Sequence, residues 1–457
     1  MRWKTAPAGV AAGHPETARA GLAILEAGGS AVDAAVGACL ASCVAETVMT
    51  GYLGGGFALV CDAVRHEARV LDFFVTVPGL DARGPRGQLV ELAVPFGEEL
   101  VHYAIGPASC AVPGVPAGLR ELVRAHGRLS WEELVAPAVA LAGAGVPMPR
   151  AHAECLAMLG PVMTYTPRGE EIYAPGGALL GEGDSLSQPG LVEALQLEPR
   201  ELSARLLEAS DAFGGVLTAA DLDAYQPVWR EPAAIDYCGT QFVSRSGLAP
   251  VAPVLERLPR LAGLSPAERV VALAGALRGA DRDGDTTNLV AVDRDGNACV
   301  ITTSLGLGSG DFVPGLDLHL NSMLGETDLL CGPLAPGTRM QSMMAPSAAL
   351  AEGRVVLAAG AAGGTRLRSA LVSVVAGILD EGLDAATAVE QPRLHVAGEV
   401  AHAEPGVDED GLLALERSGF GVRRWASRHH YFGGASVVSA SGAAGDPRRS
   451  GLALPAP

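Results

Sequence analysis

The 457-residue sequence predicts an α+β fold in which a mostly helical first part is followed by a β-rich second part. Two observations lead to this prediction. Apolar residues recur at helical spacing in several segments between residues 15 and 144, and two strand-like runs, 287–292 and 298–304, flank a turn sequence. No internal repeat or low-complexity linker divides the chain. We therefore expect one composite domain.

The first elements follow from apolar spacing and capping residues. A helix is predicted over residues 15–27 and ends at Gly28. Ser30, with Asp33 three residues later, is typical of a capping box that opens a second, strongly apolar helix. Three glycines at 54–56 then precede a strand and lack a following Lys-Ser/Thr pair, which favours close backbone packing over phosphate binding.

Sequence patterns predict helices in the middle of the chain and both strands and helices further on. Residues 118–144 have a helical pattern that includes a capping box starting at Ser130, and a similar helix start occurs at Thr218. The polar segment 282–285 is predicted to be exposed and tolerant of cleavage. Further on, a strand at 355–359, a glycine-rich turn and a helix at 367–379 follow one another.

Composition excludes several classes of function. The formal charge of −18 argues against nucleic-acid and anionic-membrane partners, and the longest apolar stretch falls short of the roughly 20 residues that span a bilayer. No apolar signal segment follows the first residues, which predicts a cytoplasmic protein. Eight scattered cysteines without a CxxC pair predict reduced, packed thiols and no metal site.

The sequence Asp293–Asn297 is a strong signal for a hairpin with a five-residue loop. If Val292 faces Ala298, the antiparallel register sets Thr286 across from Ser304. A threonine hydroxyl is a poor nucleophile without a neighbouring base, and a freed α-amine with a pKa of roughly 8 can be that base. This chemistry requires self-cleavage between Asp285 and Thr286.

A negative oxygen develops when the hydroxyl attacks a carbonyl, so paired backbone N–H donors are needed nearby. The turn containing Gly363 and Gly364 is the predicted source, because glycine lets the backbone approach a substrate closely. A Thr-Thr pair at a strand start is by itself most often ordinary β-structure.

Ordered sequence blocks across nearly the whole chain resemble the gamma-glutamyltransferase (gamma-glutamyltranspeptidase) family. They are 28–35, 51–57, 112–114, 127–138, 217–225, 286–297, 304–310, 320–323, 342–346 and 360–366. The resemblance implies a four-layer αββα sandwich of the N-terminal-nucleophile hydrolase type, with no metal or cofactor. It implies a precursor cut into parts 1–285 and 286–457 that stay associated, and it leaves export open. Thr286 corresponds to the family's nucleophile and Ser304 to its hydrogen-bonding neighbour.

The expected substrate is a small-molecule γ-glutamyl amide, yet the binding positions depart from the family pattern. Phe74 stands where the resemblance places an Arg for the substrate carboxylate, and an aromatic ring cannot replace a bidentate guanidinium. The acidic residue for the substrate amine is shifted to Glu326, and Met343 follows Ser342 in place of a second serine. Asn321 lies in another matched segment.

Three functions remain open on these residues. The first is hydrolysis or transfer of a γ-glutamyl group through a threonyl acyl-enzyme. The second is an amidohydrolase or acylase for a non-glutamyl acyl group, which Phe74 suggests. The third is a non-catalytic family member. Arg339, Arg366 and Arg368 are alternative carboxylate ligands, although solvated or structural arginines are the commoner case.

Overall fold

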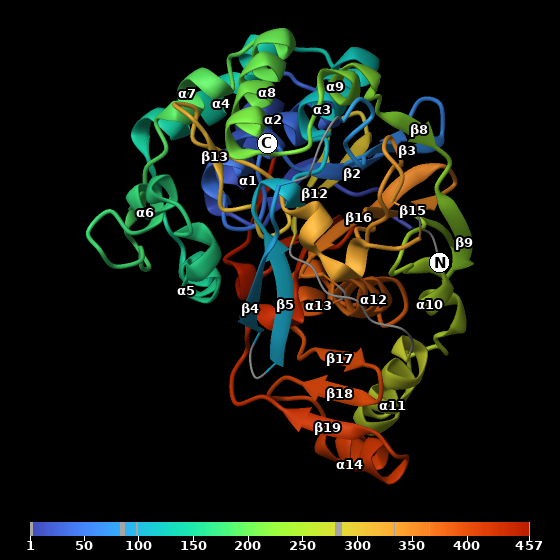
Figure 1. The fold of residues 1–457 in the computed structure, drawn as a ribbon. Coiled ribbons are helices and arrows are strands. Elements are labelled where there is room, and N and C mark those ends of the chain that lie inside the picture. The colour runs from blue at the N-terminus through green and yellow to red at the C-terminus, as the bar shows by residue number, and fades with distance from the viewer. Residues whose placement is uncertain are drawn as a thin grey trace.

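The computed structural model describes residues 3–82, 87–96, 99–278, 286–332, 334–364 and 366–456. Two antiparallel sheets face each other at its centre (Figure 1). The first sheet has the order β22 (Leu452–Pro455), β1 (Gly9–Ala12), β11 (Thr287–Val292), β12 (Ala298–Ser304), β2 (Gly55–Asp62), β3 (Glu67–Phe73) and β8 (Val228–Arg230). The second has the order β21 (Gly442–Gly445), β20 (Gly434–Ser439), β16 (Arg354–Ala362), β15 (Ser347–Ala351), β10 (Thr240–Ser244) and β9 (Ala233–Tyr237). Residues before and after 286 contribute strands to both sheets.

Helices cover the outer face of each sheet. On the first sheet lie α1 (Pro15–Glu26), α2 (Ala31–Ala45) and α3 (Val115–His126), with α4 (Trp131–Ala144) packed on α2. On the second lie α12 (Arg366–Leu379), α13 (Ala385–Glu390) and α10 (Ala252–Arg257), with α11 (Pro266–Leu277) beside α10. One apolar core fills the space between the sheets and under α12, and another lies under α1 and α2. The predicted αββα arrangement is confirmed.

The remaining elements extend this centre at its margins (Figure 1). They are the hairpin β4 (Val90–Phe96) and β5 (Glu99–Ile105), the short pairs β6 (Val146–Pro147) with β7 (Ser185–Leu186) and β13 (Phe312–Val313) with β14 (Leu318–His319), the helices α5 (Arg150–Met163), α6 (Pro167–Tyr173), α7 (Gly190–Ala194), α8 (Pro199–Phe213) and α9 (Ala219–Ala224), and a unit of β17 (Leu394–Ala397), β18 (Val400–Ala403), β19 (Gly421–Arg424) and α14 (Glu409–Arg417). None of the helices in the described ranges is both long and apolar enough to cross a membrane.

Local signals in the sequence explain the position of α2. The Ser30 hydroxyl accepts the Asp33 N–H, and the Asp33 carboxylate accepts the Ser30 N–H at 2.8 Å, which is the predicted capping box. Asp293 of the hairpin loop accepts the Ala31 N–H at 3.0 Å and so joins the start of α2 to the start of the second part. All 15 residues of α2 are buried, as its apolar composition predicts. The 118–144 pattern proves to be two helices, separated by Gly127–Ser130.

The hairpin has the predicted register. Val292 pairs with Ala298 and Thr287 pairs with Thr303, so that the next position outward sets Thr286 beside Ser304. The glycine turn before β2 packs as predicted, because a methyl group on Gly54 would lie 2.1 Å from the Ser304 carbonyl oxygen. A side chain at 54 would therefore displace the end of β12.

Candidate active site

Thr286 and Ser304 lie together where β11 begins and β12 ends. Each is only 4% exposed. The Ser304 hydroxyl accepts the Gly306 N–H at 2.9 Å, which fixes its orientation at the start of the following loop. Asp285, the other side of the predicted cleavage site, lies outside the described residues.

The two faces of this hairpin have different surroundings. In β11 the residues Val290 and Val292 belong to the core between the sheets, whereas Leu289 and Ala291 belong to the core under α1 and α2. Strand alternation therefore directs Thr286 toward the second sheet and Thr287 toward the helices.

Asn288 and the glycine turn show how the second sheet approaches the hairpin. The Asn288 amide donates to the Gly434 carbonyl of β20 at 3.1 Å, and a methyl group on Gly360 of β16 would lie 3.1 Å from the Asn288 Cβ. β16 ends at Ala362, and Gly363 and Gly364 follow with φ of 114° and 57°. These left-handed values suit glycine. The predicted order of strand, glycine turn and helix is confirmed.

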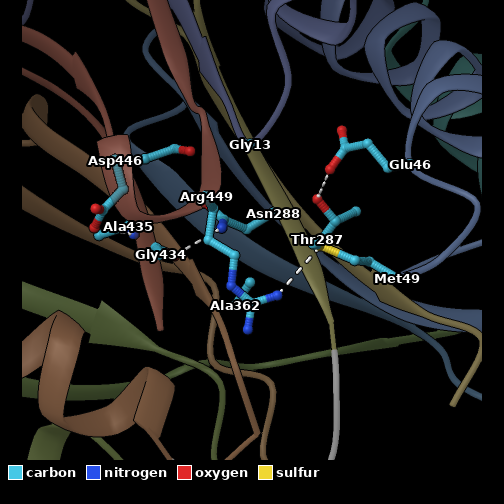
Figure 2. A pocket seen from close by; sticks show the side chains of 11 residues that line it. Gly13, Glu46, Met49, Thr287, Asn288, Ala362, Gly434, Ala435, Asp446 and Arg449 are labelled. Carbon is cyan, nitrogen blue, oxygen red and sulfur yellow. Dashed lines mark hydrogen bonds between the residues drawn. The ribbon is translucent and has the colours of Figure 1, made fainter. Parts of the chain in front are cut away.

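A small cavity lies beside β11, the strand that follows Thr286 (Figure 2). It is lined by Gly13, Glu46, Met49, Thr287, Asn288, Ala362, Gly434, Ala435, Ser436, Asp446 and Arg449. Ala362 immediately precedes the glycine turn, so this cavity borders both β11 and the predicted oxyanion turn. Arg449 crosses it, and a methyl group on Gly363 would lie 3.2 Å from the Arg449 Nη2.

Glu46, at the end of α2, has no exposed surface. Its carboxylate accepts the Thr17 hydroxyl at 2.7 Å and also the Thr287 hydroxyl (Figure 2). Burial raises the pKa of Glu46 to about 7, and the hydrogen bonds from Thr287 and Thr17 oppose part of this rise. Sequence analysis missed Glu46, because nothing in its spacing separates it from an ordinary residue at the end of a helix.

The acidic residue predicted to hold a substrate amine lies near Ser304. Glu326 is 2% exposed, and a methyl group on Gly306 would lie 2.5 Å from its Oε1. Gly306 is two residues beyond Ser304 in the same loop. The structure therefore brings the Glu326 carboxylate against the loop that leaves the predicted active site.

Phe74 directly follows β3, at the same end of the first sheet as Ser304. A methyl group on Gly55, the partner of Ser304 in β2, would lie 3.1 Å from the Phe74 Cα. The Phe74 ring is 1% exposed and stacks on Phe57, with centroids 5.5 Å apart. Its carbonyl accepts the Tyr225 hydroxyl at 2.8 Å. The ring thus belongs to the core between the sheets.

Other predicted residues have clear structural contacts. Asn321 donates to the carbonyls of Leu53 and Ala111, at 2.9 and 2.8 Å, and accepts the Ala111 N–H, so its amide joins two loops. The Ser342 carbonyl accepts from Arg245 at 2.7 Å, and Met343 lies in the core.

The alternative arginines also contact protein groups. Arg339 donates to the carbonyls of Phe74 and Gln226 and, at 2.7 Å, to the Tyr225 hydroxyl. Arg368 donates to the Leu277 carbonyl at 3.3 Å, and the Arg366 guanidinium stacks over an aromatic ring. Across the described ranges, no group of three His, Cys, Asp or Glu side chains is arranged to hold a metal ion.

Comparison with known proteins places these features in a family. The family model described as Gamma-glutamyltranspeptidase matches residues 17–278 and 263–456. The chain is 26% identical to the glutathione hydrolase proenzyme of Bacillus subtilis, over 90% of this chain and 84% of that protein. It is 27% identical to the acylase ACY 1 proenzyme of Pseudomonas sp. strain V22, over 91% and 87%.

A solved structure has the same fold. Cephalosporin acylase from Bacillus halodurans superposes with a TM-score of 0.81 at 22% identity, covering 99% of this chain and 97% of that one. The family match spans both parts of the chain and includes the segments that carry Thr286, Ser304 and the glycine turn. The chain therefore belongs to the gamma-glutamyltranspeptidase family of hydrolases and transferases.

Proposed function

We propose that the chain is a self-processing enzyme that hydrolyses or transfers the acyl group of an amide through an acyl-enzyme on Thr286. The observation that supports this most directly is the placement of Thr286 beside Ser304, with the Gly363–Gly364 turn on the facing sheet. A nucleophile, a neighbouring hydroxyl and candidate oxyanion donors thus come from three separate strands.

Maturation begins with attack of the Thr286 hydroxyl oxygen on the Asp285 carbonyl carbon. The C–N bond between the two residues breaks as the acyl group passes to oxygen, and the nitrogen takes the proton. Water then hydrolyses the ester, which leaves the Asp285 carboxylate and a free α-amine on Thr286. Both sheets contain strands from both products, so parts 1–285 and 286–457 stay associated.

In turnover the α-amine takes the proton of the Thr286 hydroxyl as its oxygen attacks the substrate amide. The amine product leaves with a proton, and water or an acceptor amine releases the acyl group. The N–H groups of Gly363 and Gly364 are the proposed donors to the oxyanion in each step, because no side chain is needed for such contacts. The Ser304 hydroxyl holds the nucleophile in place.

The proposed donor is a γ-glutamyl amide whose ammonium group binds Glu326. A second candidate donor lacks the α-carboxylate, and one observation favours it: the position expected to hold a guanidinium has a buried Phe74 ring stacked on Phe57. Both candidates use the same chemistry at Thr286.

The first experiment tests self-cleavage. Intact mass and N-terminal sequencing should find two chains, the smaller beginning at Thr286, while the Thr286→Ala variant stays as one chain. A wild-type protein that remains a single chain on prolonged incubation would refute the proposal and support a non-catalytic family member.

The second experiment separates the donors with a matched series of anilides. γ-Glutamyl anilide has both charged groups, 4-aminobutyryl anilide lacks the carboxylate, glutaryl anilide lacks the amine, and butyryl anilide lacks both. If Glu326 binds the amine, the first two are cleaved fastest and Glu326→Gln lowers their kcat/KM more than that of butyryl anilide. A preference for butyryl anilide, or for 4-aminobutyryl anilide over γ-glutamyl anilide, would assign the donor that lacks the α-carboxylate.

A further inference from the structure

We propose that Glu46 is a positioning residue for the Thr286 nucleophile and acts through the hydroxyl of Thr287. The proposal rests on the proposed function of Thr286. Glu46 does not touch the predicted reacting atoms, because Thr287 and Thr286 point to opposite faces of β11. Its effect is on the geometry of the strand start.

The Glu46 side chain is held by its own surroundings. The Glu46 N–H bonds the Ser42 carbonyl at 2.8 Å, and the Glu46 carbonyl accepts the N–H groups of Met49 and Thr50, at 2.8 and 2.9 Å. The backbone is therefore fixed on both sides. Gly13 closes the carboxylate in, because a methyl group there would lie 3.1 Å from Glu46 Oε2.

The hairpin is anchored from this segment at two paired positions. Thr287 donates to Glu46, and its partner across the hairpin, Thr303, shares a 2.9 Å hydrogen bond with Thr50. The next pair outward is Thr286 with Ser304. The segment 46–50 thus holds the pair Thr287 and Thr303 on the face of the sheet that the helices cover. Thr286 and Ser304 face the opposite side.

The anionic form of Glu46 is the one that fits these contacts, since both hydroxyls donate to it. The charged or titratable groups that face it are Arg449 and Asp446 across the cavity and Cys43 one turn earlier in α2. From α1 and β11, the groups that face Glu46 are the hydroxyls of Thr17 and Thr287. A protonated carboxyl would have to donate one hydrogen bond, which changes the orientation of Thr287.

Burial places the pKa of Glu46 at about 7, so the positioning form is populated above neutral pH. We therefore expect the kcat ratio of wild type to Glu46→Gln to be about tenfold at pH 8 and close to one at pH 5.5, because a 1 Å misplacement of a reacting group can cost about a hundredfold and a displacement relayed through Thr287 should be smaller. KM should change by less than twofold. A ratio that does not depend on pH would refute the proposal.

Threonine variants provide the matched controls. Thr287→Val should reproduce the loss seen in Glu46→Gln, the double variant should be no slower than either single variant, and Thr287→Ser should recover activity relative to Thr287→Val. Thr17→Val removes the other hydrogen bond to the carboxylate and should move the acid limb of the kcat profile to higher pH. Additive losses in the double variant would show that the two residues act separately.

Outcomes for this proposal and for the function itself are distinguishable. A wild type that never releases Thr286 contradicts the proposed function, whereas normal processing with equal activity in Glu46→Gln contradicts only the role of Glu46. Glu46→Gln could also accumulate as uncleaved precursor. If this precursor unfolds as cooperatively as the uncleaved Thr286→Ala variant, the protein is folded and the result supports a positioning defect. If Glu46→Gln does not fold, an unmoved acid limb in Thr17→Val refutes the proposal.

Discussion

The buried carboxylate of Glu46 should make the stability of the fold depend on pH in a predictable direction. Its folded pKa of about 7 lies above the ordinary value of 4.5, so the folded state binds the proton more tightly than the unfolded chain. The contribution to stability is therefore fully present below about pH 4.5 and is lost as the pH rises through 7.

The size of this effect follows from the two pKa values. Their difference corresponds to about 3 kcal/mol at pH values well above 7. Unfolding entropy scales with chain length and is roughly 1 kcal/mol per degree for a chain of this size, so the loss corresponds to roughly 3 °C in Tm. Glu46→Gln cannot ionise and should escape this loss.

The assay is thermal unfolding at pH 5, 6, 7 and 8, with both proteins in the Thr286→Ala background so that cleavage does not complicate the comparison. Titration of all other groups is common to both proteins and cancels. The difference between the Tm of the Glu46→Gln protein and the Tm of the protein that keeps Glu46 should rise by roughly 3 °C between pH 5 and pH 8. Glu182→Gln, at an exposed position, controls for loss of a surface carboxylate. A constant difference, or one that falls with pH, would show that folding does not raise the pKa of Glu46 and would refute this reasoning.

Four further predictions concern the rest of the site. Ser304→Ala should slow self-cleavage by at least tenfold while the protein stays folded, measured by the time course of chain separation; an unchanged rate would remove Ser304 from the mechanism. Gly54→Ala should lower both Tm and processing, because its methyl group would meet the Ser304 carbonyl at 2.1 Å, and a normal Tm would contradict the close packing. Asp446→Asn should destabilise the fold by about 3–5 kcal/mol in denaturant unfolding, since it breaks a buried ion pair with Arg393; a loss below 1 kcal/mol would contradict this. Phe74→Arg should lower Tm without improving γ-glutamyl anilide cleavage, because the ring position is fully buried; a gain in kcat/KM would refute this.

The elements that local patterns determine were predictable from the sequence. A capping box depends on residues three apart, which is why Ser30 and Asp33 located the start of α2. A hairpin register depends on its loop, so Asp293–Asn297 was enough to set Thr286 beside Ser304. Both predictions used information from fewer than about twenty neighbouring positions.

Features that depend on distant contacts were not predictable in this way. The two donors to Glu46 lie 29 and 241 residues away along the chain, so neither the burial of its charge nor its contact with Thr287 has a local signal. The same holds for Phe74. The resemblance showed that an arginine is missing there, but only the fold shows that the ring packs on Phe57 in the core.

These contacts explain how the nucleophile region and the substrate pocket can differ independently. Thr286 is positioned by the hairpin register, by close packing of the glycine turn on Ser304, and by contacts from the segment 46–50 on the helical side. Phe74 lies beside Gly55, the partner of Ser304, and its ring stacks on Phe57 in the core between the sheets. The hydrogen bonds described at the strand start do not involve the Phe74 side chain. The proposed acyl chemistry at Thr286 is therefore compatible with a donor other than a γ-glutamyl amide.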